Sequence, residues 1–403
     1  MIRVLVLTDF SSGYGRNLLR GIVRYSQQVG GWTFYRMPLS YRMLHGDKGV
    51  VEWAKKWGAD AIVAQLGDVD IKLLRDLKIP IIVQNYQDRI SGVCNLTGDY
   101  IGTGRIAADF FLRKGYYNFA YYGITDTVWA RERGEGFRLE LEQRGYRAYQ
   151  FLESSPMREA WNYDLESLGQ WLLSLPKPVG LFACDDQFAL QVSETCQIFS
   201  IRVPEEVAIL GVDNDELLCN IASPQLSSIM LDVENGGYMA GHTLHQLIRK
   251  RIEAPYNISV GALQVVERQS TQKYVIEDPY ILQTVAYIEQ NYATRLSVND
   301  LLERIPLSRR ILEKRFKQNT GLTLYQFIQR YRIDHFARQL ISTRRAVKDI
   351  AFSCGFDDCK NLSRVFCKFK QMTPSAYRRK YGVHRRGGYY AILNYREVLV
   401  MAL

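Results

Sequence analysis

The sequence predicts two α/β lobes followed by an all-α domain with two helix-turn-helix units. Over residues 1–268, short apolar runs alternate with stretches of helical period, a pattern typical of parallel sheets covered by helices. Beyond that region the strand pattern stops, and the excess of positive charge begins. The 403 residues are enough for two or three domains.

The first region contains more β-α units than one compact sheet would hold. Strands are expected at Val4–Leu7, Ala61–Val63, Ile81–Val83, Phe119–Tyr122, Val179–Ala183, Val207–Gly211 and Ala262–Glu267. We therefore expect two lobes with a ligand-binding cleft at the carboxyl ends of the strands. The predicted boundaries are 1–268 for the sensing domain, 269–280 for a polar linker, 281–382 for the helical domain and 383–403 for a tail.

Composition and charge narrow the classes of function. No apolar run suits a membrane helix, the N-terminus has no secretory-signal pattern, and the seven cysteines form no Cys-x-x-Cys pair. We expect a cytoplasmic protein without a metal or a cofactor. Residues 281–403 carry 23 Lys and Arg against 9 Asp and Glu, whereas the rest of the chain carries 29 against 33. This basic region favours nucleic acid, with an anionic membrane surface or a solvated face as alternatives.

The first helix-turn-helix unit is expected around Pro306. A short amphipathic helix at 298–304 ends there, because proline lacks an amide donor, and Ser308 can cap the next helix. In that helix Ile311, Leu312 and Phe316 form the predicted buried side. The side chains expected to point outward, toward a DNA major groove, are Arg309, Arg310, Glu313, Lys314 and Lys317.

The same pattern occurs a second time. A helix at Val347–Ser353 and a turn at Cys354–Phe356 precede a helix that Asp357 or Asp358 caps. Its expected buried residues are Leu362, Phe366 and Phe369, and its expected outward residues are Lys360, Asn361, Arg364 and Lys368. A longer helix at Leu324–Ser342 is predicted to join the two units.

This region resembles the arabinose-operon-regulator (AraC) family of transcription factors. The residues that carry the resemblance are Ile350-Ala351, Gly355-Phe356, Leu362-Ser363-Arg364, Phe366, Thr373-Pro374 and Tyr377-Arg378. The resemblance implies two helix-turn-helix units in successive major grooves, with bases contacted by Arg310, Glu313, Lys314, Lys360, Asn361 and Arg364. Arg310 and Cys359 depart from the family's usual residues, so the resemblance does not predict the DNA sequence.

Acidic residues follow two strands of the sensing region. Asp185-Asp186 and Asp213-Asn214-Asp215 suit a hydrolase pair, a cation site or recognition of sugar hydroxyls, whereas helix capping is the simplest interpretation for Asp186 and Asp215. The five histidines do not cluster, and no nucleophile or phosphate-loop motif accompanies the carboxylates. Gly102-x-Gly104-x-x-Ala107 matches the dinucleotide fingerprint but lies outside the first strand-to-helix turn, so no nucleotide cofactor is expected.

Residues 1–268 resemble the effector domain of the lactose-repressor family. The segments that carry this resemblance are Val203–Asn214 and Pro224–Ile229. It implies the two-lobed fold of periplasmic sugar-binding proteins, with an inducer contacted by Arg133, Asp185 and Asp213. Further candidate ligand-binding residues are Asp9, Arg16, Trp129 and Asn214, and a structural role is the alternative for Asp9, Arg16 and Trp129.

The order of the two domains is similar to that in the family of xylose operon regulators. Segments 129–133, 211–217 and 266–271 carry this similarity. It implies a non-enzymatic activator of pentose-utilisation genes that binds operator DNA and D-xylose or a related pentose. A homodimer and contact with RNA polymerase are expected, and no membrane. A sugar-processing enzyme and a sugar-binding protein with an incidental nucleic-acid-binding tail remain alternatives.

Overall fold

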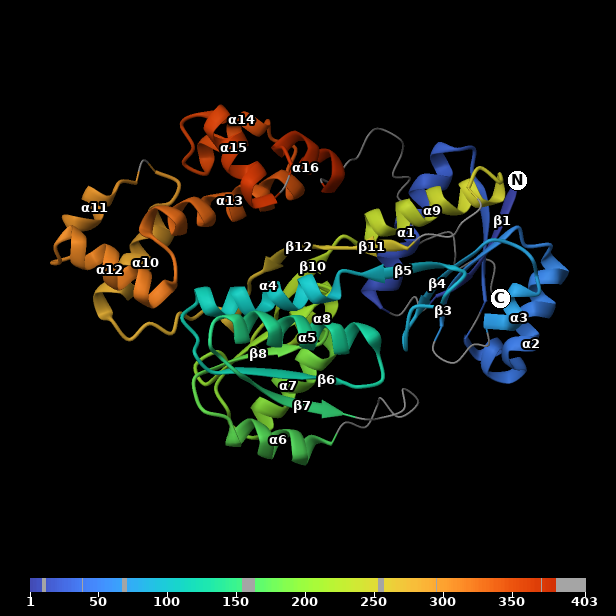
Figure 1. Ribbon diagram of the computed structural model, residues 1–403, viewed down its shortest axis with the longest axis horizontal. Coiled ribbons are helices and arrows are strands. Elements are labelled where there is room, and N and C mark those ends of the chain that lie inside the picture. Colours follow the sequence, from blue (N-terminus) through green and yellow to red (C-terminus); the bar gives the residue numbers. More distant parts are fainter. Residues whose placement is uncertain are drawn as a thin grey trace, which may run out of the picture. The chain divides into compact units, whose positions relative to one another are not determined.

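The first part of the chain forms two lobes, each built on a six-stranded sheet (Figure 1). The computed structural model describes residues 1–8, 12–37, 39–66, 71–153, 164–252, 257–294, 296–370 and 372–381. The predicted alternation of strands and helices and the two-lobed α/β class are confirmed. Asp9 and the tail at 383–403 lie outside the described residues.

The sheet of the first lobe has the strand order β11-β5-β4-β3-β1-β2. Its strands are β1 (Ile2–Leu7), β2 (Trp32–Arg36), β3 (Ala61–Leu66), β4 (Ile81–Asn85), β5 (Cys94–Gly98) and β11 (Ile258–Val260). Its helices are α1 (Gly13–Gln28), α2 (Leu39–Trp57), α3 (Ile71–Arg75) and α9 (Val233–Ile248). All the pairs in this sheet are parallel, and α9 lies beside α1 although it comes much later in the chain (Figure 1).

The sheet of the second lobe has the strand order β12-β10-β9-β8-β6-β7. Its strands are β6 (Phe119–Ile124), β7 (Ala148–Glu153), β8 (Val179–Ala183), β9 (Val207–Val212), β10 (Ser227–Leu231) and β12 (Ala262–Val266). Its helices are α4 (Tyr100–Arg113), α5 (Val128–Gln143), α6 (Leu165–Ser174), α7 (Asp186–Ile198) and α8 (Glu216–Ile221). The strands pair in parallel except β12, which runs antiparallel to β10.

Three crossings between the lobes are hydrogen-bonded to one another. The Asp99 amide donates to the Val260 carbonyl oxygen at 2.9 Å, and the Asp232 amide donates to the Gly261 carbonyl oxygen at 2.9 Å. Asp99 and Asp232 also precede α4 and α9 directly. Since the crossings are joined in this way, the two lobes share one hinge region.

The glycines of α4 and α5 allow these two helices to pack at close range. A Cβ atom on Gly104 would lie 2.0 Å from the Arg133 carbonyl oxygen, and one on Gly136 would lie 2.1 Å from the Ile101 carbonyl oxygen. Backbone therefore fills the space that a glycine fingerprint would leave for a phosphate. The Gly-x-Gly-x-x-Ala pattern is explained by helix packing.

The remaining described chain is helical. Its helices are α10 (Pro279–Asn291), α11 (Val298–Leu302), α12 (Arg309–Thr320), α13 (Leu324–Ser342), α14 (Val347–Ser353), α15 (Cys359–Lys370) and α16 (Pro374–Tyr381). The described residues separate into two compact units, one within 1–282 and 310–323 and the other within 283–309 and 324–381. The predicted boundaries at 268, 280 and 382 stay predictions.

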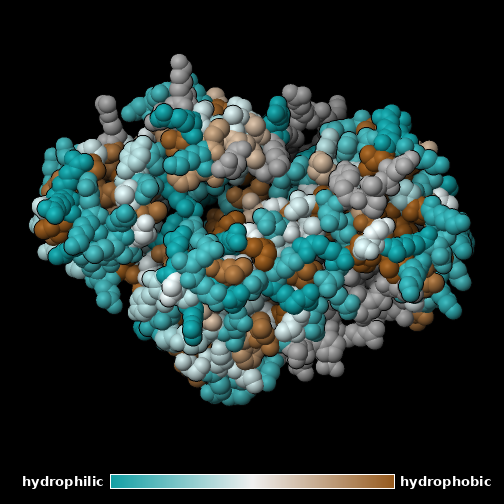
Figure 2. All heavy atoms as spheres, in the orientation of Figure 1, coloured by the Kyte–Doolittle hydropathy of each residue, from teal (hydrophilic) through white to brown (hydrophobic). Residues whose placement is uncertain are grey.

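The second unit has a core of its own around α13. Phe336 and Leu340 of α13 are fully buried and pack with Ile350 of α14, Phe366 of α15 and Tyr377 of α16. None of the described helices is long and apolar enough to cross a membrane. Hydrophilic residues predominate on the face of the molecule that Figure 2 shows.

Candidate functional site

Two carboxylates stand where neighbouring strands of the second sheet end. Asp185 follows β8 and caps α7, because its Oδ1 accepts a hydrogen bond from the Phe188 amide at 2.9 Å. Asp213 follows β9, and Asp213 and Asn214 have left-handed backbone angles, with φ of 101° and 52°. Such angles cost about 1–3 kcal/mol for a residue with a side chain and cluster at functional sites. The fold thus holds a strained turn at the carboxyl edge of this sheet.

Arg133 on α5 brings a buried guanidinium to the same place. Its side chain is 4% exposed, its Nη1 donates to the Cys184 carbonyl oxygen at 2.6 Å, and its Nη2 contacts Asp213 Oδ1 at 3.5 Å. The rings of Tyr100 and Trp129 lie 5.6 and 5.4 Å from the guanidinium carbon. The buried Arg133 Nε has no hydrogen-bond partner among the described residues. The structure brings the predicted arginine and carboxylates together and leaves one buried donor unsatisfied.

Three further side chains belong to this cluster and were missed from the sequence: Tyr14 on α1, Gln84 on β4 and Tyr100 at the start of α4. Burial raises the pKa of Tyr14, and Tyr100 and Asp213 raise it further. Arg133 and a hydrogen bond with Gln84 act in the opposite direction on the pKa of Tyr14. Since α1 and β4 belong to the first lobe, both lobes contribute to the cluster. The position of Gln84 near the end of a buried strand was the available signal.

The carboxylates of this cluster are harder to ionise than exposed ones. Burial, followed by the neighbouring Asp213 carboxylate, raises the pKa of Asp185 to about 6. The amide of Phe188 and the charge of Arg133 limit this rise in the pKa of Asp185. Burial also raises the pKa of Asp213, and Arg133 opposes it. Asp185 therefore gains or loses its proton in mildly acidic solution, near pH 6.

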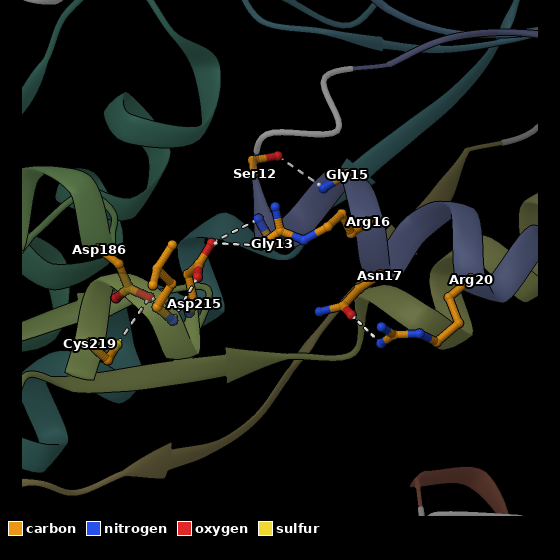
Figure 3. A network of polar contacts seen from close by, with 10 residues as sticks. Ser12, Gly13, Gly15, Arg16, Asn17, Arg20, Asp186, Asp215 and Cys219 are labelled. Atoms are coloured by element: carbon orange, nitrogen blue, oxygen red, sulfur yellow. Dashed lines mark hydrogen bonds and ion pairs between the residues drawn. The ribbon is translucent and has the colours of Figure 1, made fainter. Parts of the chain in front are cut away.

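Arg16 lies on α1 and contacts a different carboxylate (Figure 3). Its Nη2 is 3.6 Å from Asp215 Oδ2, and the same oxygen accepts a hydrogen bond from the Gly13 amide at 2.8 Å. Asp215 also caps α8 by accepting a hydrogen bond from the Leu217 amide at 3.1 Å. The capping interpretation of Asp215 is confirmed, and the same side chain joins the two lobes.

The capping interpretation is wrong for Asp186. The cap of α7 is Asp185, and Asp186 is a buried residue inside the first turn of that helix. Its Oδ2 accepts a hydrogen bond from the Asp215 amide at 2.7 Å, and the Cys219 thiol lies 3.5 Å from the same oxygen (Figure 3). Asp186 thus supports the Asp213–Asp215 turn. No group of three or more His, Cys, Asp or Glu side chains within the described ranges is placed to hold a metal ion.

Helices are present at the positions of both predicted helix-turn-helix units, α11 and α12 in the first and α14 and α15 in the second. Every side chain expected to face outward on α12 is exposed, and so are Arg364 and Lys368 on α15. Lys360 and Asn361 lie on α15, but their side chains are outside the described part of the structure. Exposed basic residues on the second helix of each unit are the arrangement that fits a DNA major groove.

Two side chains expected in the core of these units are exposed. Ile311 is 43% exposed and Phe369 is 36% exposed, whereas Leu312, Phe316, Leu362 and Phe366 are buried. The apolar side of each helix is therefore one residue narrower than predicted. The turn of the second unit depends on Gly355, whose φ is 79° and whose Cβ atom would lie 2.4 Å from the Tyr292 carbonyl oxygen.

Both parts of the chain are similar to known proteins. A periplasmic binding protein-like domain matches residues 108–271, and a helix-turn-helix domain matches residues 301–380. The xylose operon regulatory protein of Escherichia coli K12 is 29% identical over an alignment of 393 residues that covers 93% of this chain and 96% of that protein. The xylose operon regulatory protein of Haemophilus influenzae is 29% identical over 93% of this chain and 98% of its own length.

A solved structure agrees over nearly the same length. The structure described as the xylose-binding transcription activator xylR is 26% identical to this chain, with a TM-score of 0.58, and covers 94% of this chain and 98% of that one. The match includes both the two-lobed region and the helical region. The chain therefore combines a periplasmic binding protein-like domain with a C-terminal helix-turn-helix domain, and it is similar over nearly its whole length to the xylose operon regulators.

Proposed function

We propose that the chain is a sugar-responsive activator of xylose-utilisation genes. The observation that carries this proposal is the convergence of Arg133, Asp185 and Asp213 at the carboxyl edge of the second sheet. An ionised carboxylate accepts hydrogen bonds from two sugar hydroxyls, and a guanidinium donates two. Tyr14, Gln84 and Tyr100 add polar groups of the kind that fix the orientation of a small ligand.

The pentose assignment draws on the names of the relatives, which are regulators of xylose operons. A thermal-shift screen of D-xylose, other pentoses and hexoses tests it, because a ligand of the folded state raises the melting temperature. We expect D-xylose to give the largest shift. A larger shift with a hexose would overturn the pentose assignment, and turnover of the sugar would favour a sugar-processing enzyme.

The binding of D-xylose should depend on pH through Asp185. The ionised carboxylate accepts hydrogen bonds on both oxygens, whereas protonation turns one oxygen into a donor, and the pKa of Asp185 is about 6. Its ionised fraction rises about tenfold between pH 5 and pH 7, so the affinity should rise by a similar factor. Calorimetric titrations at several pH values measure this rise in affinity. Asp185→Asn should bind D-xylose weakly, and its affinity should depend less on pH.

The raised pKa of Asp185 has the opposite effect on the stability of the sugar-free protein. Between about pH 4 and pH 6 the folded state holds a proton that the unfolded chain has lost. The contribution of Asp185 to the free energy of unfolding therefore falls as the pH rises through this range. Affinity and stability should change in opposite directions with pH, and a parallel change would contradict the assignment.

The exposed basic helices are proposed to bind the DNA operator. Arg364→Ala should weaken binding to the operator by about 1–3 kcal/mol and relax the preference at one base pair, provided that the guanidinium contacts a guanine. Lys317→Ala should weaken binding to all DNA sequences about equally, because a lysine on a phosphate is sequence-independent. Titrations of operator and random duplexes at several salt concentrations separate the two effects.

Arg344 offers a matched control for these two replacements. It is exposed on the segment that joins α13 to α14, outside both second helices. Arg344→Ala removes the same charge and should change base preference at no position. An equal loss on operator and random DNA for Arg364→Ala would contradict its base-reading role.

We further propose that the regulator works as a homodimer in the cytoplasm and contacts RNA polymerase at its promoter. Analytical ultracentrifugation of the full chain, with and without D-xylose, tests the dimer. In vitro transcription from an operator template tests activation. A monomer at micromolar concentration, or repression of the transcript, would require this part of the proposal to be changed.

A further inference from the structure

The segment that leaves the sensing lobes is docked on the second lobe along most of its length. We call residues 267–278 the strap. Ser270 and Thr271 of the strap are fully buried, and the Ser270 amide donates to the Gln225 carbonyl oxygen at 2.9 Å. Further along, the Val275 amide donates to the Lys114 carbonyl oxygen at 2.8 Å. The stretch predicted as a polar linker is therefore a fixed part of the lobe surface.

Lys114 strengthens this attachment with its side chain. The ammonium is nearly buried, forms an ion pair with Glu267 at the start of the strap, and lies 4.4 Å from the centre of the Tyr274 ring. Ser227 on β10 accepts a hydrogen bond from the Arg268 amide at 2.8 Å and shares another with the Thr271 hydroxyl at 2.7 Å. A displacement of the strap would break several of these contacts together.

Arg268 extends from the strap to the strained turn of the candidate site. Its Nη1 donates to the Leu226 carbonyl oxygen at 2.9 Å, and its Nη2 donates to Asn214 Oδ1 at 2.8 Å. Asn214 is adjacent to Asp213, the carboxylate that contacts Arg133. One side chain thus connects the strap to the residue next to the proposed sugar contact.

The other supports of this turn come from the lobe itself. The Asn214 amide donates to Ser228 Oγ at 2.9 Å, and the Asp215 amide donates to Asp186 Oδ2 at 2.7 Å. These supports hold the backbone, whereas Arg268 holds the Asn214 side chain. Loss of the Arg268 contact would therefore leave the turn with fewer restraints, and a change in the turn would alter the geometry at Arg268.

We propose that Arg268 is the positioning residue that couples the sugar site to the strap. This proposal rests on the proposed sugar site at Asp213. When a sugar engages Asp213, the turn at Asp213 and Asn214 adjusts, and the hydrogen bond to Arg268 transfers the adjustment to the strap. Hydrogen bonds that involve an ionised guanidinium are stronger and more directional than neutral ones, which suits such a link.

The far end of the strap contacts the first DNA-reading helix. Asp278 directly precedes α10, and its Oδ1 accepts a hydrogen bond from the Tyr280 amide at 3.0 Å. Its Oδ2 is 3.3 Å from Nη1 of Arg315 on α12. Residue 278 therefore touches the helix that carries Arg310 and Lys314. The strap offers a continuous physical route from Asn214 to α12.

The first test needs neither sugar nor DNA. Arg268→Gln should speed backbone hydrogen exchange about tenfold at both ends of the link, at residues 213–215 and at residues 270–275. Arg202→Gln is the matched control, because its side chain is 72% exposed on the same lobe and pairs with Glu206. Faster exchange in the strap with unchanged exchange at residues 213–215 would overturn the proposal.

The second test measures coupling in the full chain. The affinity for D-xylose is determined with and without a duplex that the protein selects from random DNA, and the ratio should be about 5–150 for the unmodified chain. In Arg268→Gln this ratio should fall to within about twofold of one, whereas Arg202→Gln keeps it. An unchanged ratio in Arg268→Gln would contradict the proposal.

A failure of Arg268→Gln to fold and a lack of D-xylose binding have different meanings. If Arg268→Gln fails to fold, Asn214→Gly provides a second variant, because it removes the Oδ1 atom that accepts the hydrogen bond from Arg268. Glycine adopts the left-handed backbone of this position readily. The coupling ratio of Asn214→Gly should also approach one. If the unmodified chain binds no D-xylose, the proposed function fails in its sugar assignment. The exchange experiment then still decides whether Arg268 links the turn to the strap.

Discussion

Replacing Arg133 with methionine is expected to weaken D-xylose binding about 10- to 100-fold and to lower the free energy of unfolding by about 3 kcal/mol. The guanidinium is 4% exposed and satisfies both the Cys184 carbonyl oxygen and the Asp213 carboxylate. Methionine keeps most of the side-chain volume but leaves the buried Cys184 carbonyl oxygen and the partly exposed Asp213 carboxylate without this donor. The loss is therefore an unpaired-charge effect more than a cavity effect.

Arg138 on the same helix provides the control for this replacement. Its side chain is 37% exposed and forms ion pairs with Glu135 and Glu142 at the surface. Arg138→Met should leave sugar affinity and stability nearly unchanged, because exposed ion pairs contribute little. Calorimetry gives the affinities, and urea denaturation gives the free energies of unfolding. Retained sugar affinity in Arg133→Met would place the sugar elsewhere.

The lobes could be predicted because their central strands are long apolar runs. The strands missed include β5, which is buried but contains polar residues, and the short β11. Also missed were β2 and β7, which stand at the ends of the two sheets. Their residues are partly exposed, with burial patterns that lack a continuous apolar stretch. Sequence patterns report burial, so an edge strand that is half solvated gives little signal.

The site was predicted in part for a similar reason. Asp185 and Asp213 directly follow strands, and their placement at one edge of the sheet follows from parallel topology. Tyr14 and Gln84 come from the other lobe, and no local pattern in the sequence tells how the two lobes face each other. The role of Arg268 was also hidden, because it depends on a contact with Asn214, far away in the chain.

The helical region shows where a periodic pattern stops being informative. Ile311 and Phe369 were placed in the core because they lie near other apolar residues on one side of a helix. Periodicity gives the direction of the apolar side but not its width. Ile311 follows two exposed arginines at the start of α12, and Phe369 lies 6.0 Å from the Arg330 guanidinium near the end of α15. Both are at edges of the buried side, where solvent reaches them.

Replacing Gly104 with alanine is expected to lower the free energy of unfolding by about 2 kcal/mol and to weaken sugar binding as well. Alanine favours a helix over glycine by about 1 kcal/mol, so the change would stabilise an isolated helix. Here the added Cβ would lie 2.0 Å from the Arg133 carbonyl oxygen and 2.6 Å from the Phe137 amide nitrogen. Both are backbone atoms, so the helices must separate, and the cost of separation exceeds the helix preference.

The same displacement explains the expected loss of affinity, because the helix that moves carries Arg133. Arg105 is exposed on the solvent side of α4. Arg105→Ala should therefore change neither the free energy of unfolding nor the sugar affinity appreciably. Thermal and urea denaturation measure the stability, and D-xylose calorimetry measures the affinity. If Gly104→Ala were as stable as the unmodified chain, the close approach of α4 and α5 would not limit this position. A loss of stability with unchanged affinity would show instead that Arg133 keeps its place when the two helices move apart.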